Sequence, residues 1–192
     1  MLEELISVFE KANKTLITKD NELFITKVSE RTLCGALMLH LHEEIKETKY
    51  KDYNVDVEYN RNLGGKLKTI IKTISGPGEK VIRINCDLIV HSRGHKVNQD
   101  NLIAVEMKKS ERLNTEKESD KERLIALTKK SFNDVWSYDG KTFPEHVCGY
   151  ELGIYYEIDY KVNEIILEYY VAGNLYSKKV LNFNLASKSV IY

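Results

Sequence analysis

Three carboxylates stand out because each disagrees with the residue pattern around it. Glu30 heads the apolar stripe of a predicted helix, while Asp87 and Glu106 lie in otherwise apolar predicted strands. An isolated buried charge destabilises a protein unless it finds a partner. If the three elements pack together, the acids repel one another, so one must take up a proton or a cation must lie among them. Carboxylate oxygens completed by water are the ligands that Mg²⁺ prefers.

Lys108 adds an ammonium group to these acids. It follows Glu106 by two residues, which places both side chains on one face of a strand, roughly 6 to 7 Å apart. There it could hold or help to deprotonate an attacking water molecule. A metal ion would lower the pKa of that water and stabilise negative charge on a phosphate. The four residues together predict hydrolysis of a phosphodiester.

The strand "NLIAVEMKKS" (101–110) must present Glu106 and Lys108. Alternation puts Leu102 and Ala104 on the face of these two residues, and Ile103, Val105 and Met107 on the other. Apolar residues on both faces are typical of a strand in the middle of a mixed or parallel sheet between helices. We expect an antiparallel hairpin with the preceding strand, "VIRINCDLIVHS" (81–92), in which Asp87 shares a face with Ile89 and His91.

Periodicity predicts the remaining elements. Helical spacing of apolar residues opens the chain at Leu2 and recurs over 29–45, where Ser29 is the expected N-cap and Cys34, Leu37 and Leu41 follow Glu30 on one face. The other expected elements are a strand over 53–60, a weakly patterned stretch over 62–80, a helix over 119–132, and strands over 149–159, 164–173 and 175–185. Asn163 is expected in the turn between two of these strands.

Composition limits the class of protein. The 192 residues, 42% hydrophobic and 30% charged, predict one globular domain over 1–192. Three separated cysteines indicate a reducing compartment. The N-terminus is too charged for a secretory signal, and no apolar run is long enough to span a bilayer. We therefore expect a soluble, cytoplasmic protein without a membrane partner.

These motifs resemble a known family. Asp87, followed by Glu106-Met107-Lys108, is similar to the signature of the PD-(D/E)XK nucleases, which have the restriction-endonuclease-like fold. The segments "SERTL", "VDVEYNR", "CDLIVHSRG", "NLIAVEMKKS", "DKERLIALT" and "GYELGIYYEI" follow the order of the family's αβββαβ core over about 29–159. The resemblance is to one of the family's mostly uncharacterised prokaryotic branches. Cys86 stands where the motif's name has proline, a position that varies in such proteins.

The resemblance implies a fold and a set of roles. The fold is α/β, with a central mixed sheet flanked by helices, an N-terminal helix and extra C-terminal strands. Asp87 and Glu106 would bind Mg²⁺, which Mn²⁺ could replace, while Glu30 assists from its helix and Lys108 serves the nucleophilic water. The backbone carbonyl of Met107 is a further expected ligand. The implied activity is Mg²⁺-dependent hydrolysis of phosphodiester bonds, of DNA above all, in restriction or defence against foreign DNA.

Nucleic acid is the expected partner, although the formal net charge is zero. Basic residues concentrate between Arg61 and Arg83, and acidic residues toward the end of the chain. Residues expected to contact phosphates are His91, Arg93, Lys109, Lys66, Lys68 and Lys72. A homodimer would place two sites across a duplex.

Other interpretations remain open beside the nuclease. Glu106 and Lys108 could form an ordinary salt bridge, and Glu30 could simply favour a helix N-terminus. Asp56 could add an acid to the site or lie on an exposed strand face. A zinc site at His91 and His95 lacks a known ligand spacing. The alternative function is a non-cleaving module of the same fold that binds nucleic acid or a protein.

Overall fold

The computed structural model describes residues 1–59, 69–73, 79–83, 86–96, 99–129, 135–137 and 148–184, with only the backbone for 69–73, 79–83 and 135–137. The helices are α1 (Leu2–Lys19), α2 (Asn21–Ile25), α3 (Glu30–Lys46) and α4 (Asn114–Thr128). The strands are β1 (Asn54–Val57), β2 (Thr69–Thr73), β3 (Glu79–Arg83), β4 (Leu88–His91), β5 (Asn101–Lys109), β6 (Val135–Ser137), β7 (Leu152–Asp159), β8 (Glu164–Val171) and β9 (Asn174–Asn182). None of the helices among these residues is both long and apolar enough to cross a membrane.

The main sheet has six strands in the order β1-β4-β5-β7-β8-β9. β5 pairs antiparallel with β4 and parallel with β7, so the sheet is mixed and β5 lies in its middle. Every residue of β5 from Asn101 to Met107 is buried. The α/β class, the central position of this strand and the β4–β5 hairpin are therefore confirmed.

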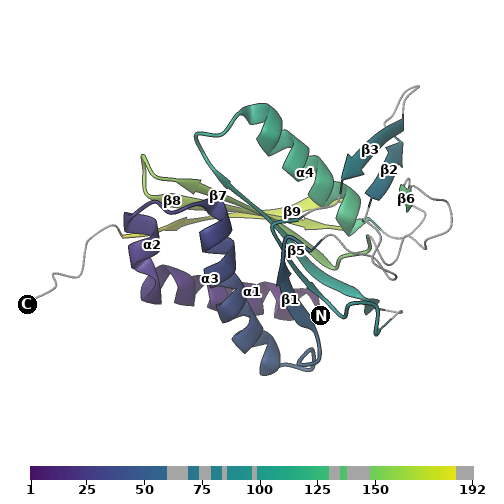
Figure 1. Ribbon diagram of the computed structural model, residues 1–192, viewed down its shortest axis with the longest axis horizontal. Coiled ribbons are helices and arrows are strands. Elements are labelled where there is room, and N and C mark those ends of the chain that lie inside the picture. Colours follow the sequence, from purple (N-terminus) through teal and green to yellow (C-terminus); the bar gives the residue numbers. More distant parts are fainter. Residues whose placement is uncertain are drawn as a thin grey trace, which may run out of the picture.

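Helices cover both faces of this sheet. α1, α2 and α3 lie on one side and α4 on the other (Figure 1). Val105 and Met107 of β5 pack in the apolar cluster that includes α1 and α3, whereas Ala104 packs with Leu124 and Leu127 of α4. From Ile103 onward the expected alternation therefore directs the two faces of β5 into two separate helical layers. Leu102 was expected on the Ala104 face, but it packs in the cluster of α1 and α3, next to an irregularity in the β4–β5 register.

The helix that carries Glu30 forms as its sequence predicts. The Ser29 side chain caps α3 by accepting a hydrogen bond from the Thr32 backbone N–H at 3.2 Å. Such a cap satisfies a backbone donor that the first turn leaves unpaired. Cys34, Leu37 and Leu41 are buried on the face that Glu30 heads. The cap and this stripe fix Glu30 over the end of β5.

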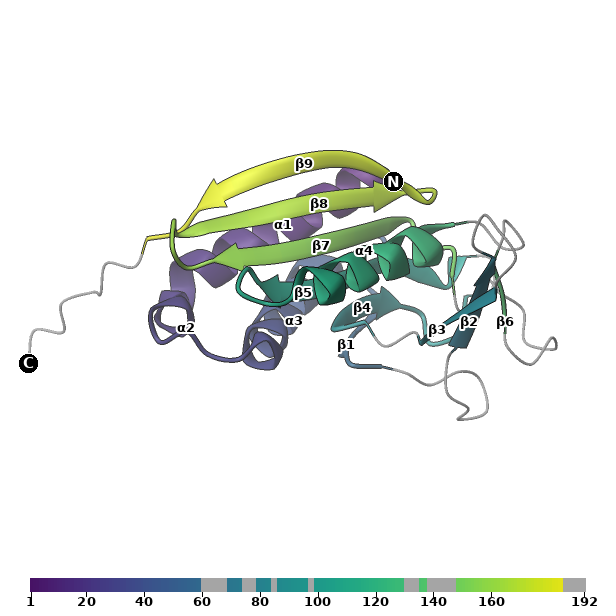
Figure 2. The same ribbon diagram turned by 90° about the horizontal axis from the view of Figure 1, so that it is seen from above.

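Two predicted boundaries were wrong. The run over 81–92 is not one strand, because β3 pairs with β2 in a separate three-stranded sheet, β3-β2-β6, beside the main one (Figure 2). β4 begins only at Leu88. At Asp87 the side chain, and not the backbone, accepts the next hydrogen bond from β5. α4 begins at Asn114, five residues before Ser119, the expected start. Polar residues without apolar periodicity fill this first turn, so the pattern gave no sign of it.

Candidate active site

Two carboxylates continue the hydrogen-bond ladder of β5 where β4 has ended. The last β4–β5 pair is Leu88 with Val105. Two residues further along β5, the Met107 N–H donates to Asp87 Oδ2 at 2.8 Å, and the Lys109 N–H donates to Glu30 Oε1 at 2.9 Å. Buried backbone N–H groups require such partners. Unpaired main-chain donors at the end of β5 thus draw Asp87 and Glu30 to this edge.

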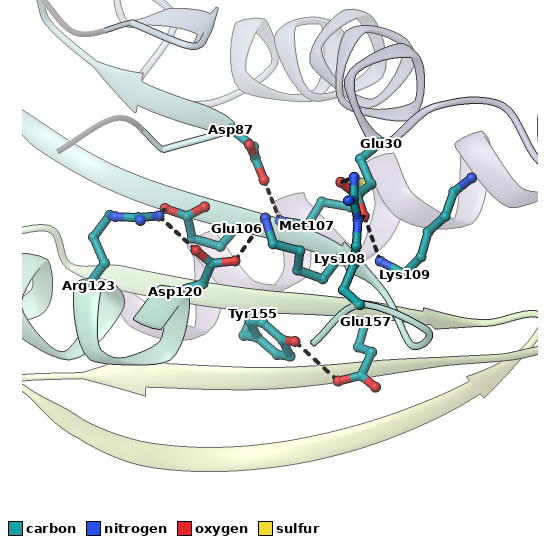
Figure 3. A network of polar contacts seen from close by, with 11 residues as sticks. Glu30, Asp87, Glu106, Met107, Lys108, Lys109, Asp120, Arg123, Tyr155 and Glu157 are labelled. Atoms are coloured by element: carbon teal, nitrogen blue, oxygen red, sulfur yellow. Dashed lines mark hydrogen bonds and ion pairs between the residues drawn. The ribbon is translucent and has the colours of Figure 1, made fainter. Parts of the chain in front are cut away.

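Glu106 and Lys108 point toward α4 and meet two charged side chains of that helix (Figure 3). Arg123 Nη1 donates to Glu106 Oε1, and the same nitrogen lies 3.0 Å from Asp120 Oδ1. Lys108 Nζ lies 3.0 Å from Asp120 Oδ2. Among the described residues, the simple Glu106–Lys108 bridge considered above is therefore replaced by a chain of four alternating charges.

Asp120 and Arg123 were not predicted from the sequence. They lie one turn apart on α4, on the side that buries Leu124 and Leu127. Asp120 heads this apolar stripe just as Glu30 heads the stripe of α3. An acid at the head of an apolar helical stripe is the signal in the sequence that Asp120 shares with Glu30.

Burial and neighbouring acids disfavour the charged form of Glu106. Burial raises the pKa of Glu106 to about 8; Arg123 opposes this rise, whereas Asp87 and Asp120 add to it. Burial also raises the pKa of Asp87 against the opposing effects of the Met107 N–H and Lys108. Such shifted carboxyl groups are frequent in functional sites.

Lys108 is held in its charged form. Burial lowers its pKa, but the contact with Asp120 and the nearby Asp87 and Glu106 outweigh burial, so the pKa lies above its ordinary value. A protonated lysine donates hydrogen bonds and stabilises negative charge, but it does not accept a proton. In this arrangement Lys108 is suited to holding a water molecule or a phosphate oxygen.

Two residues expected to contact phosphates lie at the other end of β4. His91 Nε2 lies 2.9 Å from Asp56 Oδ2, and Arg93 Nε donates to the same oxygen at 2.8 Å. His91 is four residues from Asp87, roughly 13 Å along an extended chain. The structure therefore gathers His91, Arg93 and Asp56 in a separate cluster.

The remaining expected contacts are divided between described and undescribed parts of the chain. Lys109 points to the α3 side of β5, where its Nζ donates to the Lys27 carbonyl at 3.0 Å. Lys66 and Lys68 lie outside the described residues, and only the backbone of Lys72 is described, within β2.

A hollow of about 610 Å³ opens beside Glu30. Its lining consists of Ser29, Glu30, Arg31, Lys109, Glu111 and Arg112. Arg112 contacts both oxygens of Glu30, at 3.3 and 3.4 Å. Arg31 and Arg112 were not singled out from the sequence, and with Lys109 they give this hollow three basic side chains.

The residues fit Mg²⁺ in their donor chemistry. Asp87, Glu106 and Asp120 offer carboxylate oxygens, and their mutual repulsion is what a cation would relieve. As they stand, however, no three or more His, Cys, Asp or Glu side chains of the described residues are grouped so as to hold a metal ion. In the part of the chain that the structure describes, the cation that contacts Glu106 is the guanidinium of Arg123.

Comparison with known proteins leaves the family resemblance a prediction. No protein-family model, curated protein or solved structure matches this chain. A function must therefore rest on the residues at the end of β5 and on the elements that bring them there.

Proposed function

We propose that this chain is a Mg²⁺-dependent nuclease that hydrolyses phosphodiester bonds, with DNA as the preferred substrate and restriction or defence as its setting. The observation that carries the proposal is the excess of buried acid around Glu106. Among the residues that the structure describes, three carboxyl groups, of Asp87, Glu106 and Asp120, lie near two cations, Lys108 and Arg123. A site with several converging carboxyl groups and a fixed ammonium is suited to binding a divalent cation and a phosphate.

The order of elements supports the proposal. From α3 the chain runs through β1, β4, β5, α4 and β7, with the β2–β3 pair between β1 and β4. This succession agrees with the αβββαβ core of the restriction-endonuclease-like fold. In such a core, Asp87 precedes the second strand and Glu106 lies near the end of the third. This order is compatible with the proposed ligand roles, although the resemblance expected Asp87 within the second strand and it lies one residue before β4.

Each residue has a distinct proposed role. Asp87, Glu106 and the Met107 carbonyl would hold Mg²⁺, with Glu30 assisting. When bound, the metal would polarise the phosphate and lower the pKa of a water molecule. Lys108, kept charged and positioned by Asp120 at 3.0 Å, would donate to the attacking water or to a phosphate oxygen.

Basic groups beside the site would contact the nucleic-acid backbone. The hollow lined by Arg31, Lys109 and Arg112 adjoins Glu30. Lys66, Lys68 and Lys72 stay predicted contacts. Phosphate binding of this kind releases counterions, so affinity for DNA should fall as the salt concentration rises. Salt-independent binding would contradict this part of the proposal.

The test is a cleavage assay with the purified protein. Single-stranded and double-stranded DNA and RNA are incubated with Mg²⁺, Mn²⁺ or EDTA, and the wild type is compared with Glu106→Ala and Lys108→Ala. The matched control is Glu168→Gln, which removes another buried carboxylate that pairs with an α4 lysine. We expect metal-dependent cleavage by the wild type and the control only. Equal cleavage by all variants, or none on any substrate, would refute the proposal.

One observation favours the second candidate, a module that binds nucleic acid or a protein without cleaving it. Arg123 already neutralises Glu106 in the structure, so the acid has a partner without any metal. Binding of DNA that is unaffected by EDTA, together with absence of cleavage, would support this candidate over the nuclease.

A further inference from the structure

The two halves of α4 contact the sheet in different ways. Toward its C-terminal end, Leu124 and Leu127 are buried in an apolar cluster with Ala104 and Tyr155. The preceding turns instead bring charged side chains to the sheet. These pairs are Lys117 with Glu157 at 3.2 Å, Asp120 with Lys108 at 3.0 Å, Lys121 with Glu168 at 3.0 Å, and Arg123 with Glu106. The helix is therefore anchored at one end, while ion pairs cover the candidate site.

Arg123 stands at the boundary between these halves. Glu106 is 1% exposed and the Arg123 side chain 18% exposed, so their contact is shielded from solvent. The same Nη1 also reaches Asp120 Oδ1 at 3.0 Å. A carboxylate has two oxygens, and both a guanidinium and a metal ion are attracted to them. A divalent cation on either oxygen of Glu106 would lie close to the Arg123 guanidinium, and the two positive charges would repel each other.

We propose that Arg123 is a built-in counter-ion of Glu106, which a divalent cation displaces when it binds. This inference rests on the proposed function, because it takes Glu106 to be a metal ligand. On displacement, Arg123 keeps Asp120 as a partner one turn away on the same helix, so the guanidinium is not left without an acid. Asp120 in turn retains Lys108. Arg123 is thus a positioning residue that sets how tightly the site binds its metal.

Metal affinity measured by titration calorimetry tests this inference. Mn²⁺ and Mg²⁺ are titrated into the full-length wild type, Arg123→Gln, Arg123→Lys, Glu106→Gln and the control Lys121→Gln. Arg123→Gln removes the competitor, and we expect it to bind Mn²⁺ roughly tenfold more tightly, the scale of one hydrogen bond to a charged group. Arg123→Lys keeps the positive charge but lacks the planar guanidinium, so its affinity for Mn²⁺ should lie between those of the wild type and Arg123→Gln. Lys121→Gln should match the wild type, and Glu106→Gln should lose binding.

The sign of the effect separates competition from structural damage. A variant that merely loosens the fold would bind metal more weakly, whereas loss of a competitor tightens binding. Equal or weaker Mn²⁺ affinity of both Arg123 variants, or no binding by any protein, would overturn the inference. If affinity is unchanged while the wild type still cleaves DNA, the counter-ion role is refuted and the nuclease stands. If affinity tightens but no substrate is cleaved, the counter-ion role stands and the nuclease is refuted.

Discussion

Two clusters of charged side chains lie at opposite ends of β4, and they affect their carboxylates in opposite ways. At one end, Asp56 accepts contacts from two basic side chains, His91 and Arg93. Although burial raises the pKa of Asp56, these two contacts hold it well below its ordinary value. At the other end burial, together with the nearby Asp87 and Asp120, raises the pKa of Glu106 to about 8 despite the contact with Arg123.

In one cluster the neighbouring groups stabilise the charged carboxylate, and in the other the surroundings disfavour it. Asp56 gains stability from its neighbours in the folded state, as a structural carboxylate should. Glu106 is held in surroundings that disfavour its charged form, which weakens the fold unless a further cation binds. Proteins retain such local conflicts mainly where they serve a function. We therefore interpret the Asp56 contacts as structural, and the strained position of Glu106 supports the proposal that Glu106 serves a function.

The largest expected effect is the loss of cleavage in Glu106→Gln. The amide cannot supply the anionic oxygen that the proposed metal site needs, so we expect the cleavage rate to fall at least about 100-fold. The midpoint of urea denaturation at pH 7 should not fall, because the pKa of Glu106 lies near 8 and the folded protein already favours its neutral form. A large loss of stability without loss of cleavage would reverse the assignment of the two clusters.

Asp56→Asn should show the converse behaviour. It removes the charge that both His91 and Arg93 contact while preserving the shape of the side chain. We expect unfolding to become easier by roughly 2 to 3 kcal/mol, the worth of hydrogen bonds to a charged group in a site of limited exposure. Urea denaturation at pH 7 measures this loss. A free energy of unfolding equal to that of the wild type would show that these contacts do not stabilise the fold.

The two clusters should also give opposite dependences of stability on pH. The pKa of Glu106 rises on folding from 4.5 to about 8. Between these two pH values the folded protein binds a proton on this carboxyl group, whereas the unfolded chain does not. Its contribution to stability is complete below that range and is lost as the pH rises, by up to about 1.4 kcal/mol per pH unit. The wild type should therefore lose stability relative to Glu106→Gln from pH 5 to pH 8.

For Asp56 the sign is reversed. Its pKa is lowered on folding, so its contribution is complete above the unfolded value of 3.8 and is lost as the pH falls below it. The stability difference between wild type and Asp56→Asn should stay constant at neutral pH and shrink in acid. Denaturation series from pH 3 to pH 8 measure both trends, and parallel curves for all three proteins would contradict them.

Local pattern was sufficient for those parts of the site that lie on single elements. The Ser29 cap and the apolar stripe predict where Glu30 lies, and strand alternation predicts that Glu106 and Lys108 share a face. Asp87 was found because it interrupts an apolar run. Each of these inferences uses only neighbours in sequence.

Partners across the fold could not be predicted in this way. Arg123 meets Glu106 because α4 packs across β5, and no local period relates residues 17 positions apart. β4 begins only after Asp87, because the Asp87 side chain takes the place of a backbone acceptor for the Met107 N–H. The apolar pattern of the sequence does not reveal this contact. Both outcomes follow from tertiary packing and from the need to satisfy buried donors.

The smallest expected effect concerns Glu30, which stands between the two classes. Its Oε1 accepts the Lys109 N–H at 2.9 Å, a structural contact, yet it also adjoins the proposed metal site. Glu30→Gln keeps an oxygen for that N–H and loses only the ion pair with Arg112, whose side chain is 53% exposed, so the urea midpoint should barely change. If Glu30 assists the metal, cleavage should nevertheless fall roughly tenfold, as when a supporting ligand is altered. Unchanged cleavage would place Glu30 with the residues kept for folding and confine the chemistry to β5, Asp87 and α4.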